Sequence, residues 1–252
     1  MQIHGLNKTT LLDYPEHVAA TIFTGGCNFR CPFCHNKDLV LNPSAQPIIE
    51  EKEVLDFLHK RRGIITGVCV TGGEPTLQPD LKEFLWKIKQ IGLNVKLDTN
   101  GYKPEILIDV IENGLVDYVA MDIKSSKERY AYAVGYEEAG AHTEGIGQDK
   151  DAQTVHFKFM LENIEKSVEY LMQNKVPYEF RTTIVRELHA DKEIEKIGEW
   201  IKDCSAYFLQ AYEENENVIQ AGFHPCSKEE MVRFSEILKK YILNTQIRGI
   251  DI

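Results

Sequence analysis

The chain has 252 residues, of which 43% are hydrophobic, so it can bury one substantial core, and we expect a single domain over 1–252. Its formal net charge is -10, and Lys and Arg are scattered along the chain, so neither a nucleic acid nor an anionic membrane surface is an expected partner. No basic leader and no apolar run of about 20 residues is present, which predicts a cytoplasmic protein whose six cysteines are thiols or metal ligands.

Short apolar runs rich in β-branched residues recur along the chain, and each predicts a buried strand. These runs are AATIF at 19–23, VCVT at 68–71, VKLD at 95–98, YVAMDI at 118–123, EFRTTIV at 179–185 and YFLQA at 207–211. Amphipathic stretches alternate with them and predict helices at 49–62, 80–92, 103–114, 158–174 and 191–203. Strands alternating with helices predict an α/β protein, a partial (β/α)6 barrel related to the TIM barrel, with its core at about 15–213.

Two segments depart from this alternation. Residues 135–153 are rich in Gly and acidic residues, and they predict an excursion before the fourth crossover helix. The tail at 227–252 predicts a last helix followed by a short strand.

The sequence CNFRCPFC at 27–34 places three cysteines directly after the first predicted strand, at the end where barrels of this kind assemble their chemistry. Three thiolates can hold three irons of a cubane cluster and leave the fourth iron open. A structural zinc site uses four protein ligands, and the other cysteines, Cys69, Cys204 and Cys226, are isolated. Spacing therefore favours an open iron–sulfur cluster, with zinc or a chance spacing as the alternatives.

Polar residues follow the next predicted strands. Glycines in TGGEPTLQ at 71–78 allow close approach of a ligand, although GGEP alone is more often a turn. Asp98 and Asp122 end adjacent strands, where their charges repel unless a cation or a cationic ligand lies between them. Arg181, in the fifth strand, can bind a carboxylate, and an ordinary surface ion pair is its alternative.

The C-x3-C-x2-C spacing with an aromatic residue before the last cysteine resembles the signature of the radical S-adenosylmethionine enzymes. The resemblance implies that Cys27, Cys31 and Cys34 bind a [4Fe-4S] cluster whose open iron chelates S-adenosylmethionine. It also implies cleavage of this cofactor to methionine and a 5'-deoxyadenosyl radical, after one electron is supplied by a reduced flavodoxin or ferredoxin.

The same resemblance assigns roles to the later motifs. Gly72, Gly73 and Glu74 are expected at the amino group of S-adenosylmethionine, and Lys124 is expected to reach the cofactor. Asp98, Thr99 and Asp122 resemble a site for a monovalent cation, for which Mg2+ or plain hydrogen bonding are the alternatives. The full set of expected cofactor-binding residues is Phe33, Gly72, Gly73, Glu74, Asp98, Asn100, Lys124 and Arg181.

The segments around the cysteine motif indicate which branch of this superfamily the chain resembles. The stretch GLNKTTLLDYPEHVAATIFTGGCNFRCPFCHN at 5–36 resembles the activating proteins of anaerobic ribonucleoside-triphosphate reductase, and also pyruvate formate-lyase activases. Residues 37–68 contain no cysteine, whereas activases of other glycyl radical enzymes often carry an additional cysteine-rich insert there. Departures from the pattern occur at VRELHAD (185–191), at the acidic AYEENENVIQAG (211–222) and at the excursion, which are segments that would meet a partner.

The function expected from this resemblance is that of an enzyme that abstracts hydrogen from a glycine of a partner glycyl radical enzyme. The reductase is the favoured partner, and pyruvate formate-lyase or another glycyl radical enzyme is the alternative. Two rivals remain: a radical S-adenosylmethionine enzyme acting on a small molecule, and a non-catalytic protein that holds zinc.

Overall fold

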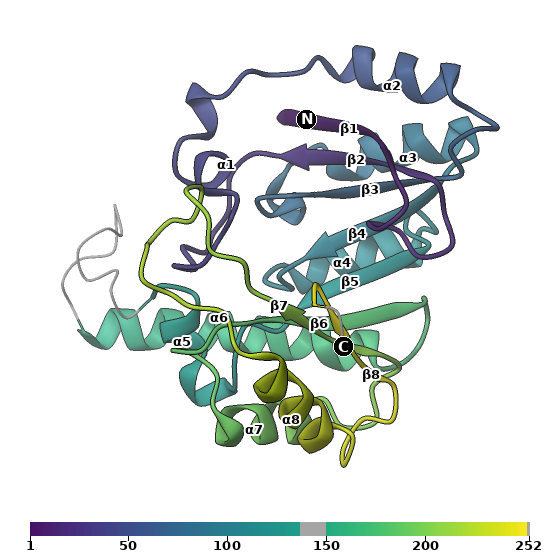
Figure 1. The fold of residues 1–252 in the computed structure, drawn as a ribbon. Coiled ribbons are helices and arrows are strands. Elements are labelled where there is room, and N and C mark those ends of the chain that lie inside the picture. Colours follow the sequence, from purple (N-terminus) through teal and green to yellow (C-terminus); the bar gives the residue numbers. More distant parts are fainter. Residues whose placement is uncertain (137–149, 251–252) are drawn as a thin grey trace.

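The computed structural model describes residues 1–136 and 150–250, and its centre is one sheet of eight strands in the order β1 to β8 (Figure 1). From β2 onward all neighbouring strands pair in parallel, whereas β1 pairs antiparallel with β2. The strands are β1 (Ile3–Thr10), β2 (Ala19–Thr24), β3 (Gly67–Gly72), β4 (Asn94–Thr99), β5 (Tyr118–Asp122), β6 (Tyr178–Ile184), β7 (Tyr207–Ala211) and β8 (Thr245–Arg248).

The six strands predicted from apolar runs are confirmed as β2 to β7, and the short strand expected in the tail is β8. The strand β1 was not predicted, because IHGLNKTT lacks a continuous apolar run and only its first residue, Ile3, is buried. Its pairing with β2 is also interrupted by register shifts, so period-2 patterning is weak there.

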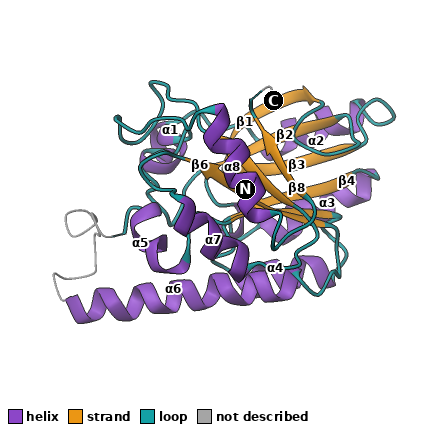
Figure 2. Cartoon of the chain, turned by 60° about the horizontal axis from the view of Figure 1, so that its bottom comes forward, coloured by secondary structure: helices purple, strands orange, loops and turns teal. Residues whose placement is uncertain are grey.

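Helices lie on the outer face of the curved sheet, and the long α6 runs along one side of the molecule (Figure 2). The α-helices are α1 (Lys37–Leu41), α2 (Glu51–Lys60), α3 (Leu81–Ile91), α4 (Pro104–Glu112), α5 (Tyr130–Ala133), α6 (Lys150–Leu171), α7 (Asp191–Trp200) and α8 (Lys228–Leu238). Local signals explain several ends: Gly92 closes α3 in the left-handed conformation, and Ser227 with Glu230 forms a capping box on α8.

The helix predicted at 158–174 begins earlier than expected, because α6 starts at Lys150. The last residues of the predicted excursion, 150–153, are therefore helical, which corrects that boundary. The rest of the excursion, 137–149, lies outside the described residues. The short helices α1 and α5 were not predicted, since each is too short to show a helical period.

Alternation along the strands separates two environments. In β4, Val95 and Leu97 are part of the hydrophobic core, while Lys96 and Asp98 line cavities on the other face of the sheet. The inside of the sheet is consequently polar. The strands β1 and β8 form its two edges, so the barrel is open between them. Among the described residues, no helix combines the length and apolar character that a bilayer crossing requires.

Candidate active site

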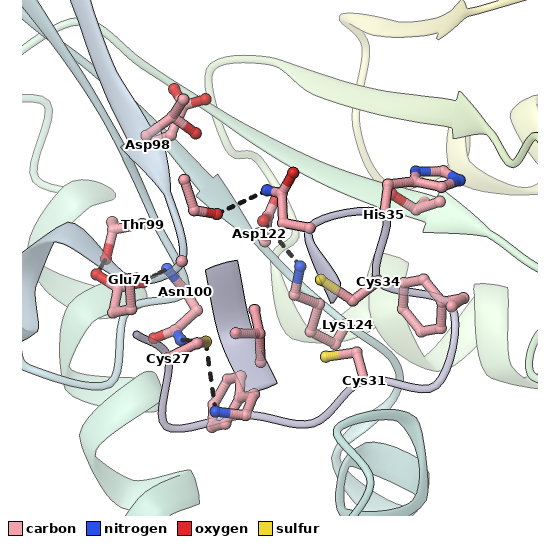
Figure 3. A pocket seen from close by; sticks show the side chains of 18 of the residues that line it. Cys27, Cys31, Cys34, His35, Glu74, Asp98, Thr99, Asn100, Asp122 and Lys124 are labelled. Carbon is pink, nitrogen blue, oxygen red and sulfur yellow. Dashed lines mark hydrogen bonds and ion pairs between the residues drawn. The ribbon is translucent and has the colours of Figure 1, made fainter. Parts of the chain in front are cut away.

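One cavity of 260 Å³ at the carboxyl ends of the parallel strands brings together every site residue predicted from the sequence (Figure 3). These residues are Cys27, Cys31, Phe33, Cys34, Gly72, Gly73, Glu74, Asp98, Thr99, Asn100, Asp122, Lys124 and Arg181. They come from loops and strand ends that are up to 154 positions apart, counted from Cys27 to Arg181. The position agrees with the rule that parallel α/β sheets place chemistry at the carboxyl ends of their strands.

The cysteine loop, which we define as residues 25–36, is held by backbone hydrogen bonds from other parts of the chain. The Arg30 amide donates to the Val134 carbonyl at 3.0 Å. From the loop after β7, the Ile219 amide donates to the Cys34 carbonyl at 3.3 Å, and the Gln220 amide donates to the Pro32 carbonyl at 2.9 Å. The acidic loop that departs from the family pattern therefore braces the cysteine loop.

The three thiols are poorly solvated, and burial controls their protonation. Burial raises the pKa of Cys27 to about 12, and it also raises the pKa of Cys31 and Cys34, whereas the charge of Lys124 acts in the opposite direction on all three. The bare thiols are therefore protonated at neutral pH. Metal binding must displace these protons, and Lys124 is a built-in cation that favours the thiolates.

The donor set fits an open cluster better than a single ion. Across residues 1–136 and 150–250, no three His, Cys, Asp or Glu side chains converge closely enough to share one metal ion, as a zinc site requires. The remaining soft donor at the cavity is His35, but its Nε2 contacts the Glu213 carbonyl at 2.6 Å and its ring stacks on Tyr212 with centroids 5.4 Å apart. Three thiols and no converging fourth ligand in this part of the chain match a cubane with one open iron.

The GGEP turn lies directly against the cysteine loop. The Glu74 amide donates to the Gly26 carbonyl at 2.8 Å, and a Cβ on Gly73 would overlap that same carbonyl oxygen. Gly72 has a φ of +116°, which a residue with a side chain rarely adopts. The Asn36 side-chain amide donates to the Gly72 carbonyl at 2.7 Å and adds a second link. Gly73 is thus explained by its contact with the cysteine loop, whereas Gly72 is explained by its positive φ and by the close backbone of Thr24 in β2.

Glu74 is buried and is mainly a structural acceptor. Its Oε1 accepts from the Thr76 amide at 3.0 Å, the Thr76 hydroxyl at 2.5 Å and the Thr99 hydroxyl at 2.7 Å, while Oε2 accepts from the Asn100 amide at 2.7 Å. Burial raises the pKa of this carboxyl despite these donors. A carboxylate has about four acceptor positions, so Oε2 retains capacity for one more donor. Contact with the amino group of S-adenosylmethionine stays a prediction.

Asn100 links the loop after β4 to the cysteine loop. Its side-chain amide donates to the Asn28 side-chain oxygen at 2.9 Å and lies 3.8 Å from the Cys27 sulfur. Its position therefore supports the first cysteine directly, in addition to the cofactor contact predicted for it.

Charged side chains cross the cavity in an alternating row, which we call the charge ladder: Lys96, Asp98, Arg181, Asp122 and Lys124. Lys96 pairs with Asp98, whose other oxygen accepts from Arg181 Nη2 at 3.0 Å. Arg181 Nε donates to Asp122 at 2.5 Å, and Asp122 accepts from Lys124 Nζ at 2.8 Å. The ladder stabilises charges that would otherwise be buried alone.

Arg181 is thus the cationic group between the two carboxylates. Burial opposes ionisation of Asp122, but Arg181 and Lys124 outweigh it and hold the pKa of that carboxyl well below its usual range. The pKa of Asp98 is likewise lowered, because Arg181 and Lys96 outweigh its burial. The Thr99 hydroxyl turns to Glu74 instead of toward these carboxylates. The monovalent cation remains a prediction.

Two residues that contribute to this site, Lys96 and His189, were not predicted from the sequence. Lys96 could have been found from the alternation of side chains along a strand, because it lies two positions before Asp98 in β4 and so faces the same side of the sheet. His189 lies in the VRELHAD segment and is 2% exposed. Its Nδ1 accepts from the Val185 amide at 3.0 Å, which leaves the Nε2 proton to donate to the Lys124 carbonyl at 3.1 Å. This histidine therefore fastens the loop that carries Lys124.

Comparisons with known proteins agree with this geometry. The profile of the radical SAM superfamily matches residues 21–201. A Methanocaldococcus jannaschii protein, named as a glycyl-radical enzyme activating enzyme, is 33% identical over 253 residues that cover 99% of this chain and 96% of the relative. Pyruvate formate-lyase 1-activating enzyme of Escherichia coli K12 is 30% identical over 135 residues, covering 50% of this chain and 53% of the relative.

Solved structures show the same fold at low identity. SuiB of Streptococcus suis, bound to its precursor peptide, aligns with 91% of this chain and 48% of its own, with a TM-score of 0.65 and 13% identity. The enzyme anSMEcpe, with bound AdoMet, covers 86% of this chain and 57% of its own at a TM-score of 0.55 and 17% identity. The chain spans about half the length of SuiB.

The partial barrel and the three-cysteine loop define a radical S-adenosylmethionine enzyme. The chain belongs to the glycyl-radical enzyme activating family within that superfamily. Its cofactors are accordingly a [4Fe-4S] cluster and S-adenosylmethionine.

Proposed function

We propose that this enzyme activates anaerobic ribonucleoside-triphosphate reductase by removing a hydrogen atom from one of its glycines. The match to an activating enzyme over nearly its full length is the observation that carries the reaction type. The resemblance of residues 5–36 to activators of that reductase favours the partner. The absence of cysteine from 37–68 favours the reductase and formate-lyase types over activases of other glycyl radical enzymes. A reduced flavodoxin or ferredoxin is the proposed source of the electron.

The residues of the cavity have different proposed roles: some bind the cluster, some position other groups and some compensate charge. Cys27, Cys31 and Cys34 would hold the cluster, which when bound supplies the electron that cleaves S-adenosylmethionine to methionine and a 5'-deoxyadenosyl radical. Lys124 offsets the negative charge of the thiolates. A hydrogen atom would then move from the glycine Cα to the 5'-carbon, which would give 5'-deoxyadenosine and a glycyl radical.

A glycine suits such a cavity, since without a side chain its α-carbon can come close to the 5'-carbon. The open side of the barrel, between the edge strands β1 and β8, would be the route for a partner segment. The transfer needs no general base, because the proton and the electron leave the glycine together as one hydrogen atom.

The test combines the anaerobically reconstituted enzyme, a reducing system, S-adenosylmethionine and the purified reductase, and measures the glycyl doublet by electron paramagnetic resonance. We expect a doublet with wild type and none with Cys31→Ala. The matched control is Cys204→Ala, which changes a buried cysteine outside the cavity and should retain iron and activity.

The alternatives give different results. If the doublet forms only with pyruvate formate-lyase, the reaction type holds and the partner is wrong. If wild type cleaves S-adenosylmethionine with a metabolite but never yields a doublet, the enzyme acts on a small molecule. A colourless reconstituted protein that contains zinc would contradict the whole proposal.

A further inference from the structure

The side chain of Asn100 lies against Cys27, the first of the three cysteines that are predicted to hold the cluster (Figure 3). Its Nδ2 is 3.8 Å from the Cys27 sulfur, and the Phe29 backbone amide donates to the same sulfur at 3.4 Å. Sulfur is a large acceptor, so its contacts with N–H groups are longer than those of oxygen. Two N–H donors therefore approach Cys27, one from its own loop and one from the loop that follows β4.

The orientation of the Asn100 side-chain amide is fixed by its other contacts. Its Oδ1 accepts from the Tyr102 amide at 3.0 Å, so the nitrogen end of the group faces the cysteine loop. One Nδ2 hydrogen is donated to the Asn28 side-chain oxygen at 2.9 Å, and the second is available to the Cys27 sulfur, because an amide nitrogen carries two. The backbone amide of Asn100 is held by Glu74 at 2.7 Å, and the residue is 5% exposed. The donor is thus held in place before any cluster binds.

Asn28 brings a second side-chain amide to the same place. Its Oδ1 lies 4.0 Å from the Cys27 sulfur, so the whole amide group is close to that sulfur. Its Nδ2 is buried and has no hydrogen-bond partner within residues 1–136 and 150–250. A buried donor without an acceptor is costly, and native proteins contain few of them. The unpaired donor beside a predicted cluster ligand therefore fits an acceptor that arrives with the cluster, such as one of its sulfides.

Donors at this position would change how readily the cluster accepts an electron. Hydrogen bonds to the sulfurs are one of the factors that set the potential of an iron–sulfur cluster. One-electron reduction adds negative charge to the cluster and its thiolates, so an N–H donor stabilises the reduced form more than the oxidised form and raises the potential. The effect is strongest where water is excluded, and both Asn100 and Glu74 are buried.

We propose that the side-chain amides of Asn28 and Asn100 donate hydrogen bonds to the Cys27 thiolate and the bound cluster, and so raise the cluster's reduction potential toward that of its electron donor. The inference rests on the proposed role of the three cysteines as cluster ligands, and it adds the groups that tune the cluster. Asn100 is a positioning residue in this account, because it acts on the cluster through Cys27.

The experiment is a redox titration of the reconstituted enzyme without S-adenosylmethionine or partner, followed by absorbance and electron paramagnetic resonance. In Asn100→Ala the ratio of reduced to oxidised cluster at a fixed potential should fall about tenfold, a shift of about 59 mV to more negative potential for one electron. Asn100→Asp keeps the size of the side chain and the acceptor for the Tyr102 amide but has no N–H donor, so its potential should fall as well. The control is Gln78→Ala, which removes an amide that donates to the Gly25 carbonyl of the cysteine loop at 2.8 Å and does not line the cavity. This control should keep the wild-type potential.

Iron per chain is measured for every variant, and the outcomes separate this inference from the proposed function. If both Asn100 variants keep their iron and titrate at the wild-type potential, or if the potential rises, the amides do not tune the cluster and the proposal is wrong. An equal shift in Gln78→Ala would contradict it too, because distortion of the loop would then explain the change. Should Asn100→Ala lose its iron, the titration of Asn100→Asp decides. The glycyl doublet of wild type tests the partner independently, and a wild type that binds no cluster refutes the role of the cysteines first.

Discussion

Replacing Asp122 by Asn tests the charge ladder most directly. The substitution keeps the size of the side chain but removes the charge that faces Lys124 at 2.8 Å and Arg181 at 2.5 Å. Arg181 retains Asp98 as a partner, whereas Lys124 has no other ion pair among the described residues. An uncompensated, largely buried ammonium group is the main cost of the change.

The magnitude follows from burial. Breaking a buried ion pair by removing one partner costs about 3–5 kcal/mol. The side chains are 14–23% exposed, so solvent screens part of this energy, and we take the lower end, about 3 kcal/mol. For a chain of this size each kcal/mol lowers the melting temperature by about 2–4 °C, so Asp122→Asn should melt about 6–12 °C below wild type.

The assay is thermal unfolding of the metal-free protein under anaerobic, reducing conditions, repeated at several pH values. Because the folded pKa of Asp122 is depressed, its contribution is complete above the ordinary aspartate pKa of about 3.9 and is lost as the pH falls below it. The gap between wild type and variant should therefore be constant at neutral pH and close in acid. The control is Asp56→Asn, which removes an exposed ion pair with Lys52 and should have the same melting temperature as wild type.

Two results would refute this reasoning. One is a melting temperature for Asp122→Asn that equals that of wild type at pH 7. The other is a gap of the same size at pH 7 and well below pH 3.9, since a loss of packing alone would not respond to pH.

Two further substitutions probe the neighbouring contacts. Gly73→Ala should lower the free energy of unfolding by about 1–3 kcal/mol and reduce the iron bound per chain, because its Cβ would overlap the Gly26 carbonyl of the cysteine loop. The control is Gly63→Ala, where φ is positive but the space is open, so this variant should lose stability and keep its iron. Equal iron in both variants would contradict the steric argument. His189→Phe should lower the free energy of unfolding by about 1–3 kcal/mol, because it leaves the Lys124 carbonyl without its hydrogen-bond donor. Burial lowers the pKa of His189, so below about pH 6.5 the unfolded chain binds a proton that the folded chain does not. Wild type should therefore lose stability below that pH, whereas the variant should not. Urea unfolding measured across this pH range tests the difference.

The sequence by itself determined the parallel strands and the cysteine loop. Apolar runs such as VCVT and YFLQA, alternating with amphipathic stretches, specify β3 and β7 locally, because burial on both faces of a parallel sheet demands continuous apolar residues. The C-x3-C-x2-C spacing needs no tertiary information, since three thiols within eight residues stay near one another whatever fold surrounds them.

Only the tertiary structure decided which charges meet. Asp98 and Asp122 were expected to need a cation between them, and the fold brings Arg181 to that place from β6. Such a pairing depends on the register of β5 against β6, where Asp122 lies beside Arg181, and registers between distant strands are not encoded in local patterns. The edge strand β1 was hidden for a related reason: an edge position tolerates a polar, irregular sequence, so its place beside the open side of the barrel emerges only when the whole sheet has formed.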